Sequence, residues 1–374
     1  MSATSASMSR SSSHDQAAVW ILSFHVSYAC RELGSCCDAG WPIPIEIDAL
    51  SRAQAGLATG RLQLVRDVVE PFPPVAEAPA ETPALVACTD EGCVFHRAEG
   101  PERCGIQRSL GTTAMPQACR QFPRVALRDP RGWSVTLSAA CPSAAALLED
   151  DIAPAIERID AGYMPLSGLD ATGGLPPALR PDMLMGWADW WEWERRAVEC
   201  LRTAESPPSG LDRLAGVIAA VRSWAPGDGA LGDRIDEAFD TNEPRASRLP
   251  YTPAEAIDDL LSSVPERWQP DARRALVGDR AVPPAVHRRA LIAHAFANWT
   301  AHLGQGLRTW LRSIEAVHVL LDSGVAVANV DLVVRHLADP QALATRWGVV
   351  EDAGAPTSSS APRRAQTARG TGRA

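Results

Sequence analysis

The chain has 374 residues with 45 acidic and 36 basic side chains, which give a formal net charge of −9. All of the basic residues are arginine, which excludes chemistry that needs a lysine of the protein's own, such as a Walker A loop or a Schiff base. The acidic balance argues against a nucleic-acid partner, while 46% hydrophobic residues are enough to form a sizeable core.

The N-terminal segment is polar and Ser-rich, and we expect residues 1–17 to form a disordered tail. It lacks a basic region followed by a long apolar stretch, which argues against a secretory signal. No apolar run approaches the roughly 18 residues that span a bilayer, so we expect no membrane partner. The sequence therefore predicts a cytoplasmic protein.

Residues 18–150 contain short β-like runs and many turn formers, and we expect them to form one domain. The run 43–47 alternates isoleucine with Pro44 and a glutamate, which indicates a short edge strand because proline cannot sit in a central one. The run 133–137 alternates in the same way, and the Pro-rich stretch 71–84 predicts a loop.

From residue 151 to 352 the pattern becomes helical, which predicts a second, α-helical domain. The apolar spacing from Leu184 to Leu201 indicates one helix, with Pro181 in its first turn. The segment Thr252–Glu255 has the sequence of a capping box with proline at the first helical position. Two long helical patterns follow, at 284–303 and 305–322, and the segment Asp322–Gly324 is expected to end the second.

The predicted fold class is α+β, mostly α, with a small cysteine-rich metal-binding lobe followed by an α-helical lobe. After residue 352 the chain is again rich in Ser, Pro, Gly and Arg, and we expect residues 353–374 to form a second disordered tail.

The nine cysteines are distributed unevenly, because eight of them lie before residue 142. In a reducing compartment, clustered cysteines bind metal more often than they form disulfides. Thiolates are the soft ligands that zinc and iron–sulfur clusters need; four complete a site, and three leave one iron open to a substrate. The candidate metal ligands are Cys30, Cys36, Cys37, Cys93, Cys104, Cys119 and Cys141.

Seven thiols exceed what one four-coordinate centre needs. The adjacent Cys36 and Cys37 point to opposite faces on an extended backbone and need not serve one centre, whereas on a turn both can face one cluster. The spacings do not match zinc ribbons or fingers, and the usual radical S-adenosylmethionine signature is absent. The alternative is a set of buried cysteines without metal, the interpretation we favour for Cys88 and Cys200.

The candidate cysteines lie within five segments that occur in a fixed order between residue 30 and about residue 148: CRELGSCCDAGWPIPIEID, EGCVF, CGIQRSLG, ACRQFPR and SAACPSAAALL. Together these segments resemble the flagellin lysine N-methylase family. That family belongs with the wider YkgJ-type cysteine-cluster proteins, which are described as zinc- or iron-chelating. The similarity fixes several cysteines together with their neighbours over about a third of the chain, and the helical half carries no matching motif.

The resemblance implies an iron–sulfur protein with a [4Fe–4S] cluster that transfers methyl from S-adenosylmethionine to a lysine of a protein substrate, flagellin being the family's namesake. It implies that the cluster ligands come from the seven candidate cysteines, without saying which four. The alternative is a non-catalytic cysteine-cluster protein whose zinc or iron is structural.

Three residues beside these cysteines are predicted to bind the cofactor: Arg120, Arg124 and Trp41. The two arginines would offset the negative charge of a thiolate-ligated cluster or bind a carboxylate, unless they form ordinary surface ion pairs. Trp41 would form an apolar shell around the cluster together with Phe122 and Pro123.

Two further patterns have simpler interpretations. The segment Gly227–Gly232 matches G-x-G-x-x-G, but it follows a helix-like run, so it predicts an interhelical loop instead of a dinucleotide site. The tryptophans at 187, 190, 191 and 193 are expected to pack in the core, the alternative being a groove for a peptide or for the adenine of the methyl donor.

The histidines carry weaker signals. His287, His294 and His302 fall near one face of a helical pattern, and we expect them to be satisfied core or surface histidines. His96 is close to Cys93 in the sequence, and a ligand role is the alternative interpretation for it.

Overall fold

The computed structural model describes residues 18–31, 34, 37, 43–75, 82–97, 104–160, 168–172, 174–241, 251–303 and 305–352. The predicted tails at 1–17 and 353–374 lie outside the described residues, as do Cys36 and Trp41. Helices predominate and are combined with short strands, which confirms the prediction of an α+β, mostly α fold. Within the described ranges, no helix is both long and apolar enough to cross a bilayer.

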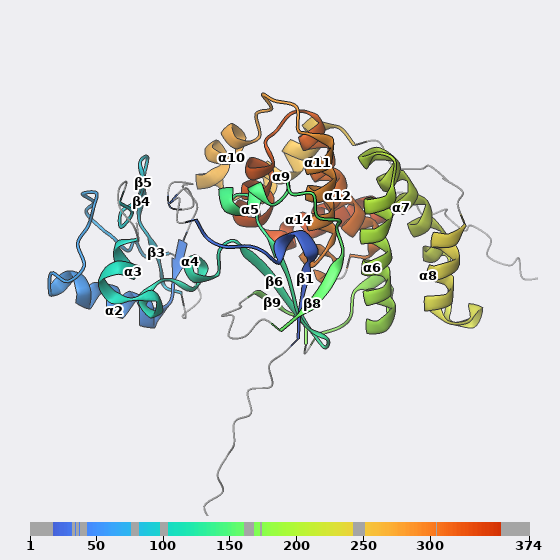
Figure 1. Cartoon of the computed structure of the whole chain (residues 1–374), viewed down its shortest axis with the longest axis horizontal. Coiled ribbons are helices and arrows are strands. Elements are labelled where there is room, and N and C mark those ends of the chain that lie inside the picture. The colour runs from blue at the N-terminus through green and yellow to red at the C-terminus, as the bar shows by residue number, and fades with distance from the viewer. Residues whose placement is uncertain are drawn as a thin grey trace, which may run out of the picture.

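A five-stranded sheet lies in the middle of the molecule (Figure 1). The strand β1 runs parallel to β7, and β6 runs parallel to β9, whereas the other neighbours are antiparallel. Three strands of the sheet precede residue 150 and two follow it. The domain boundary predicted at this residue stays a prediction. In spatial order the strands are β8 (Ile156–Ile159), β1 (Val19–Leu22), β7 (Gly132–Leu137), β6 (Arg124–Asp129) and β9 (Gly168–Asp170).

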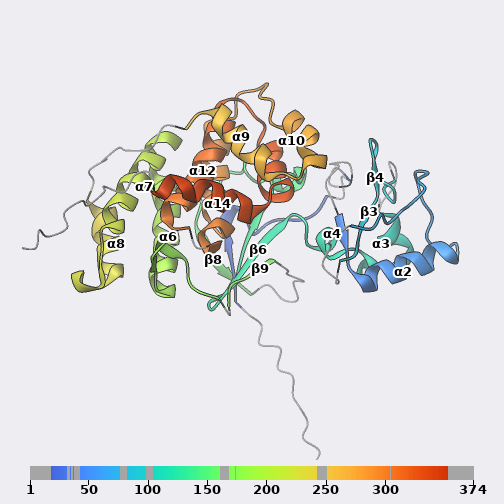
Figure 2. The ribbon, with the colours of Figure 1, turned by 180° about the vertical axis from the view of Figure 1, so that it is seen from behind.

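A small lobe, formed by residues 43–75, 82–97 and 104–121, lies beside one end of this sheet in both views (Figures 1 and 2). The predicted edge strand is confirmed as β2, which pairs with β3 in a two-stranded sheet, and Ile45 and Phe95 are buried in the lobe. The lobe contains α2 (Ile47–Ala58), α3 (Gly105–Leu110), α4 (Gln117–Gln121), β2 (Ile43–Ile45), β3 (Ala84–Val86), β4 (Cys88–Thr89) and β5 (Gly92–Cys93).

The remaining helices form a layer on the other side of the sheet (Figure 2). Trp190 and Trp193 are buried there as predicted, and Trp193 packs edge-on against Trp310 with ring centroids 5.6 Å apart. The helices are α5 (Pro142–Ala146), α6 (Trp187–Thr203), α7 (Pro207–Arg222), α8 (Leu231–Asp240), α9 (Pro253–Ser263), α10 (Gln269–Ala275), α11 (Pro284–Ala295), α12 (Leu307–Asp322), α13 (Val327–Leu332) and α14 (Pro340–Asp352).

Two helix boundaries differ from the prediction. The helix expected from Leu184 onward begins at Trp187, because Pro181 lies in the turn of a short hairpin, β10 (Ala178–Arg180) and β11 (Met183–Leu184). The helix expected over 284–303 ends at Ala295. Just after this end, Ala297 has a φ of 53°. Its N–H donates to the buried carboxylate of Glu194 at 3.0 Å, so a side chain of α6 binds the backbone where the helix ends.

Local capping signals were predicted correctly. Thr252 and Glu255 form the reciprocal hydrogen bonds of a capping box at the start of α9. The helix α12 ends at Asp322, and Gly324 follows in the left-handed region with a φ of 89°. The segment Gly227–Gly232 lies between α7 and α8, as an interhelical loop that runs into the first turn of α8.

Candidate functional site

A cavity of about 910 Å³ lies between the small lobe, the sheet and the helical layer. Its walls come from segments far apart in the sequence, from Tyr28 in the N-terminal part to Trp347 in α14. Cys36 lies outside the described residues. The other six candidate cysteines all line this cavity: Cys30, Cys37, Cys93, Cys104, Cys119 and Cys141.

Cys141 and Cys30 lie near the same tyrosine. The hydroxyl of Tyr28 is 3.8 Å from the Cys141 sulfur, and the guanidinium of Arg124 lies 5.5 Å from the centre of the Tyr28 ring. Burial raises the pKa of Tyr28, and Cys141 and Cys30 shift it further in the same direction. Tyr28 therefore stays protonated and is able to donate its hydroxyl to the Cys141 sulfur.

Cys93 and Cys104 lie on neighbouring segments of the small lobe. Cys93 ends β5, and Cys104 directly precedes α3, whose first residue, Gly105, donates its N–H to Phe95 at 2.8 Å. Cys93 is buried, and the pKa of its thiol is raised by a hydrogen bond with Cys88 and by burial. A backbone hydrogen bond thus joins the two short segments that carry Cys93 and Cys104.

Cys88 was predicted to be a buried cysteine without a metal-site role. It is half-buried and stands directly opposite Cys93 in the antiparallel pair β4–β5. Cys200, for which the same prediction was made, is buried in α6. The structure therefore confirms burial for Cys200 and places Cys88 next to a candidate ligand.

The helix α4 brings a predicted ligand and a predicted cofactor-binding arginine to the cavity wall. The carboxylate of Glu46 accepts the N–H of Gln117 at 2.9 Å, which holds the start of this helix. Arg120 lines the cavity beside Cys119 and donates from Nη2 to Gln117 at 2.6 Å. Its buried Nε has no hydrogen-bond partner in the described part of the chain, so this donor is able to take an anionic group.

Phe122 and Arg124, both predicted to lie beside the cofactor, also line the cavity. Pro123 does not belong to the lining; its carbonyl accepts the N–H of Ser138 at 2.8 Å and ties the start of β6 to the end of β7. The prediction for Trp41 falls outside the described residues.

Six thiols line the cavity, and thiols are the donor type that a thiolate-ligated metal needs. In the described part of the chain, no three His, Cys, Asp or Glu side chains are grouped closely enough to hold a metal ion. Cys36 and the other residues that flank Cys37 are outside that part. The candidate ligands thus share one cavity. The described residues do not show which of these cysteines would bind the same metal centre.

A buried acid–histidine pair also lies at the cavity wall. His294 of α11 lines the cavity and hydrogen-bonds through Nε2 to Asp331 of α13. Asp331 also accepts the N–H of Ala139 at 2.5 Å, and Arg335 lies 3.7 Å from its carboxylate. Although burial opposes ionisation, Arg335 and His294 hold the pKa of Asp331 below its usual range.

The protonation state of His294 follows from these neighbours. Burial lowers the pKa of His294, and the positive charge of Arg335 lowers it further, so the ring is neutral near pH 7. Because the ionised Asp331 can only accept, the proton of the neutral ring is on Nε2, and Nδ1 carries the lone pair. His294 is therefore a neutral ring that Asp331 holds at the cavity wall.

The other predicted histidines have structural environments. His287 contacts His318 at 3.0 Å between ring nitrogens, and His302 packs on Trp187 and Trp190. The segment of His96 pairs with that of Cys104 through an isolated bridge. Of the three histidines predicted to share a helix face, only His294 lines the cavity.

Asp331 and Arg335 were not predicted as site residues, since the contacts that join them to α11 span 37 and 42 residues. Cys88 did carry a usable signal, because a two-residue turn after Thr89 places Cys88 opposite Cys93. Comparison of the chain with protein-family models, with curated proteins and with solved structures finds no match.

Proposed function

We propose that the protein is a cysteine-ligated iron–sulfur protein that transfers a methyl group from S-adenosylmethionine to a lysine of a protein substrate, as its resemblance to flagellin lysine N-methylases implies. One observation carries the proposal: six cysteines from separate segments line a single cavity. Its volume, about 910 Å³, is in the range of small-molecule and cofactor sites. The thiols must stay reduced to bind iron, so the proposal includes a reducing, cytoplasmic compartment.

The ligands of the metal would come from the cavity cysteines and from Cys36. A bound cluster would supply an open iron position for the methyl donor. The buried Nε of Arg120 would bind a carboxylate of that donor, and the aromatic side chains of Phe296 and Trp299 would offer an apolar surface to its adenine. These roles divide the cavity into a polar, thiol-lined side and an aromatic side.

His294 would accept the proton that the substrate lysine must lose. A lysine ammonium has no lone pair, so it must become a neutral amine before its nitrogen attacks the methyl carbon of the sulfonium. The C–S bond then breaks, and its electron pair stays on the sulfur of the leaving thioether. The neutral ring of His294, fixed by Asp331, faces the cavity in which this lysine would lie.

The decisive experiment is metal and sulfide analysis of protein purified anaerobically, followed by S-adenosylmethionine binding measured by equilibrium dialysis. We expect iron with acid-labile sulfide, and binding that weakens by about tenfold or more when Cys119→Ala removes a cavity thiol. The matched control is Cys200→Ala, since Cys200 is a buried cysteine of α6 that does not line the cavity.

Stoichiometric zinc without sulfide would overturn the iron–sulfur proposal and favour the structural cysteine-cluster alternative. Equal donor binding by the Cys119→Ala variant, the Cys200→Ala variant and the unmodified protein would disconnect the donor from the cysteine cavity. In that case the methyl-transfer proposal would fail even if iron were present.

A further inference from the structure

The hairpin β4–β5 brings two cysteines into direct register. Cys88 pairs with Cys93, and Thr89 pairs with Gly92 across a two-residue turn. On the other side of the cysteine pair, Val94 donates its N–H to Ala87 at 3.1 Å. Hydrogen-bonded and non-hydrogen-bonded pairs alternate along an antiparallel ladder, so the cysteines occupy a non-hydrogen-bonded position.

This position has the spacing that a disulfide needs. Residues at a non-hydrogen-bonded position have Cα atoms about 4.5 Å apart. A disulfide accepts Cα separations of roughly 4.4–6.8 Å, so the bond can form between Cys88 and Cys93 without moving the strands far. The two thiols already contact each other through a hydrogen bond.

The two sulfurs differ in their access to solvent and to the cavity. Cys93 is buried and lines the cavity, whereas Cys88 is half-buried and is not among the lining residues. The turn residues Asp90 and Glu91 are exposed, and Cys88, next to this end of the hairpin, is the less buried cysteine of the pair. A small external disulfide would therefore meet Cys88 first.

We propose that Cys88 and Cys93 are a redox-active thiol pair that forms a reversible disulfide by exchange with a low-molecular-weight disulfide such as oxidised glutathione. The Cys88 thiolate attacks one glutathione sulfur, the glutathione S–S bond breaks, and one glutathione thiolate leaves. The Cys93 thiolate then attacks the Cys88 sulfur of the mixed disulfide and releases the second glutathione thiolate. The two protein thiols lose two electrons and two protons, and one oxidised glutathione becomes two reduced molecules.

The pair has a consequence for the metal site that rests on the proposed function. A sulfur held in a disulfide cannot serve as a thiolate ligand, so oxidation would remove Cys93 from the candidate ligands of the cavity. Metal loading and the disulfide would then exclude each other.

The sequence offers a clean readout for the pair. Because the chain has no lysine, trypsin cleaves it after arginine, and the peptide from Asp67 to Arg97 contains Cys88 and Cys93 and no other cysteine. Full-length, metal-free protein is equilibrated in glutathione buffers of increasing oxidation, quenched in acid, alkylated after denaturation, digested and weighed by mass spectrometry. We expect this peptide to carry no alkyl group and to be two hydrogens lighter than the same peptide with two free thiols, while the peptides of the other cysteines remain alkylated.

Two variants control the experiment. Cys104→Ser removes another cavity thiol and should leave the Cys88–Cys93 disulfide intact, whereas Cys88→Ser should leave Cys93 alkylated or joined to glutathione. A peptide that keeps both alkyl groups when other cysteines have oxidised, or a Cys93 that pairs with Cys104, would overturn the proposal.

A separate arm tests the link to the metal. Iron and sulfide are offered to reduced and to oxidised protein, and uptake should fall on oxidation in the unmodified chain, whereas in Cys88→Ser it should fall only in proportion to the fraction of Cys93 that is joined to glutathione. Equal uptake by both forms of the unmodified chain would overturn the exclusion of metal by the disulfide. If neither form takes up iron, the proposed function fails, while the peptide measurement still decides whether the thiol pair exists.

Discussion

His25 is the most completely buried titratable residue near the Asp331–Arg335 pair. It is 1% exposed, and its Nδ1 has no hydrogen-bond partner within the described ranges. Burial, together with the charge of Arg335, lowers its pKa from 6.5 to about 3. The folded chain therefore holds a neutral ring where the unfolded chain binds a proton below pH 6.5.

This difference predicts how stability depends on pH. Between about pH 6.5 and 3 the unfolded state binds the additional proton, so the free energy of unfolding falls as the pH falls, by about 1.4 kcal/mol per pH unit for His25 alone. His25→Phe, which keeps an aromatic ring without a titrating group, should flatten the slope of urea-unfolding free energy between pH 6.5 and 5. The control Glu192→Gln, on the exposed side of α6, should leave the slope in this interval unchanged. An unchanged slope in His25→Phe would contradict the prediction.

The residue scale also shows what local sequence can and cannot predict. Six of the cysteines predicted from their neighbours line one cavity, and their role as ligands stays a prediction. The His294–Asp331 pair could not be found in this way, since its members lie on helices brought together only by packing. The interpretation of Cys88 as a cysteine without a metal-site role stays a prediction, and its position opposite Cys93 follows from the turn register, which was not considered.

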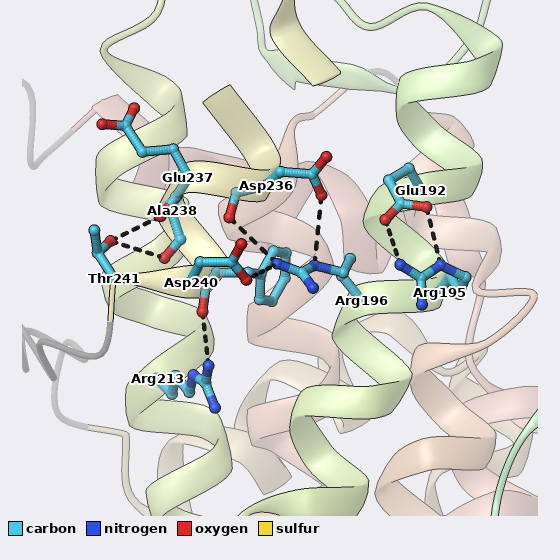
Figure 3. Close-up of polar contacts among 10 residues, drawn as sticks. Glu192, Arg195, Arg196, Arg213, Asp236, Glu237, Ala238, Asp240 and Thr241 are labelled. Carbon is cyan, nitrogen blue, oxygen red and sulfur yellow. Dashed lines mark hydrogen bonds and ion pairs between the residues drawn. The ribbon is translucent and has the colours of Figure 1, made fainter. Parts of the chain in front are cut away.

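At the scale of elements, one arginine of α6 has several partners on α8. Arg196 of α6 pairs with Asp236 and Asp240 of α8, and it stacks over the ring of Phe239 at 5.2 Å. Figure 3 shows these contacts beside those of Arg195, which binds Glu192 on its own helix. Arg196 thus joins two helices, whereas the ion pair of Arg195 lies within one helix.

The pair gives a matched test of this difference. Arg196→Ala should lower the free energy of unfolding by about 1 kcal/mol, because it removes an ion-pair network and a cation–π contact that hold α8. Arg195→Ala removes an exposed pair within one helix and should cost no more than about 0.5 kcal/mol. Urea unfolding at low and high salt measures both. Equal losses in the two variants would show that α8 does not depend on this contact.

The ends of helices were predicted correctly where neighbouring residues in the sequence determine them. The capping box of α9 and the glycine after α12 act through their immediate neighbours, and both were predicted correctly. The early end of α11 was not predicted, because the carboxylate of Glu194 that binds Ala297 comes from a helix about a hundred residues away in the sequence. The spacing of apolar residues alone does not contain such a partner.

At the scale of the whole molecule, the cavity lies where the sheet and the helical layer are joined through the backbone. The side chains of Thr136 and Arg335 donate to the carbonyl oxygen of Ala293, at 3.2 Å and 2.8 Å. Strand β7 and the segment after α13 are therefore both bonded to the same turn of α11. These bonds fix the wall that carries His294 relative to the end of the sheet. The cysteine-bearing segments line the same cavity and precede residue 142, so the two halves of the proposed chemistry come from different parts of the chain.

The absence of lysine gives the last prediction, and it rests on the proposed function. A lysine methyltransferase that contains no lysine cannot methylate its own side chains at that residue type, so any methyl-lysine must form on another protein. Incubation of the metal-loaded protein with methyl-labelled S-adenosylmethionine should leave the chain itself without methyl-lysine. Label should appear as methyl-lysine once a lysine-rich protein is added, and it should fall by about tenfold or more in His294→Gln, in which the proposed proton acceptor is lost. Excess imidazole offered to His294→Gly should restore part of the rate. Full activity in His294→Gln would remove His294 from the reaction while leaving the methyl transfer itself established.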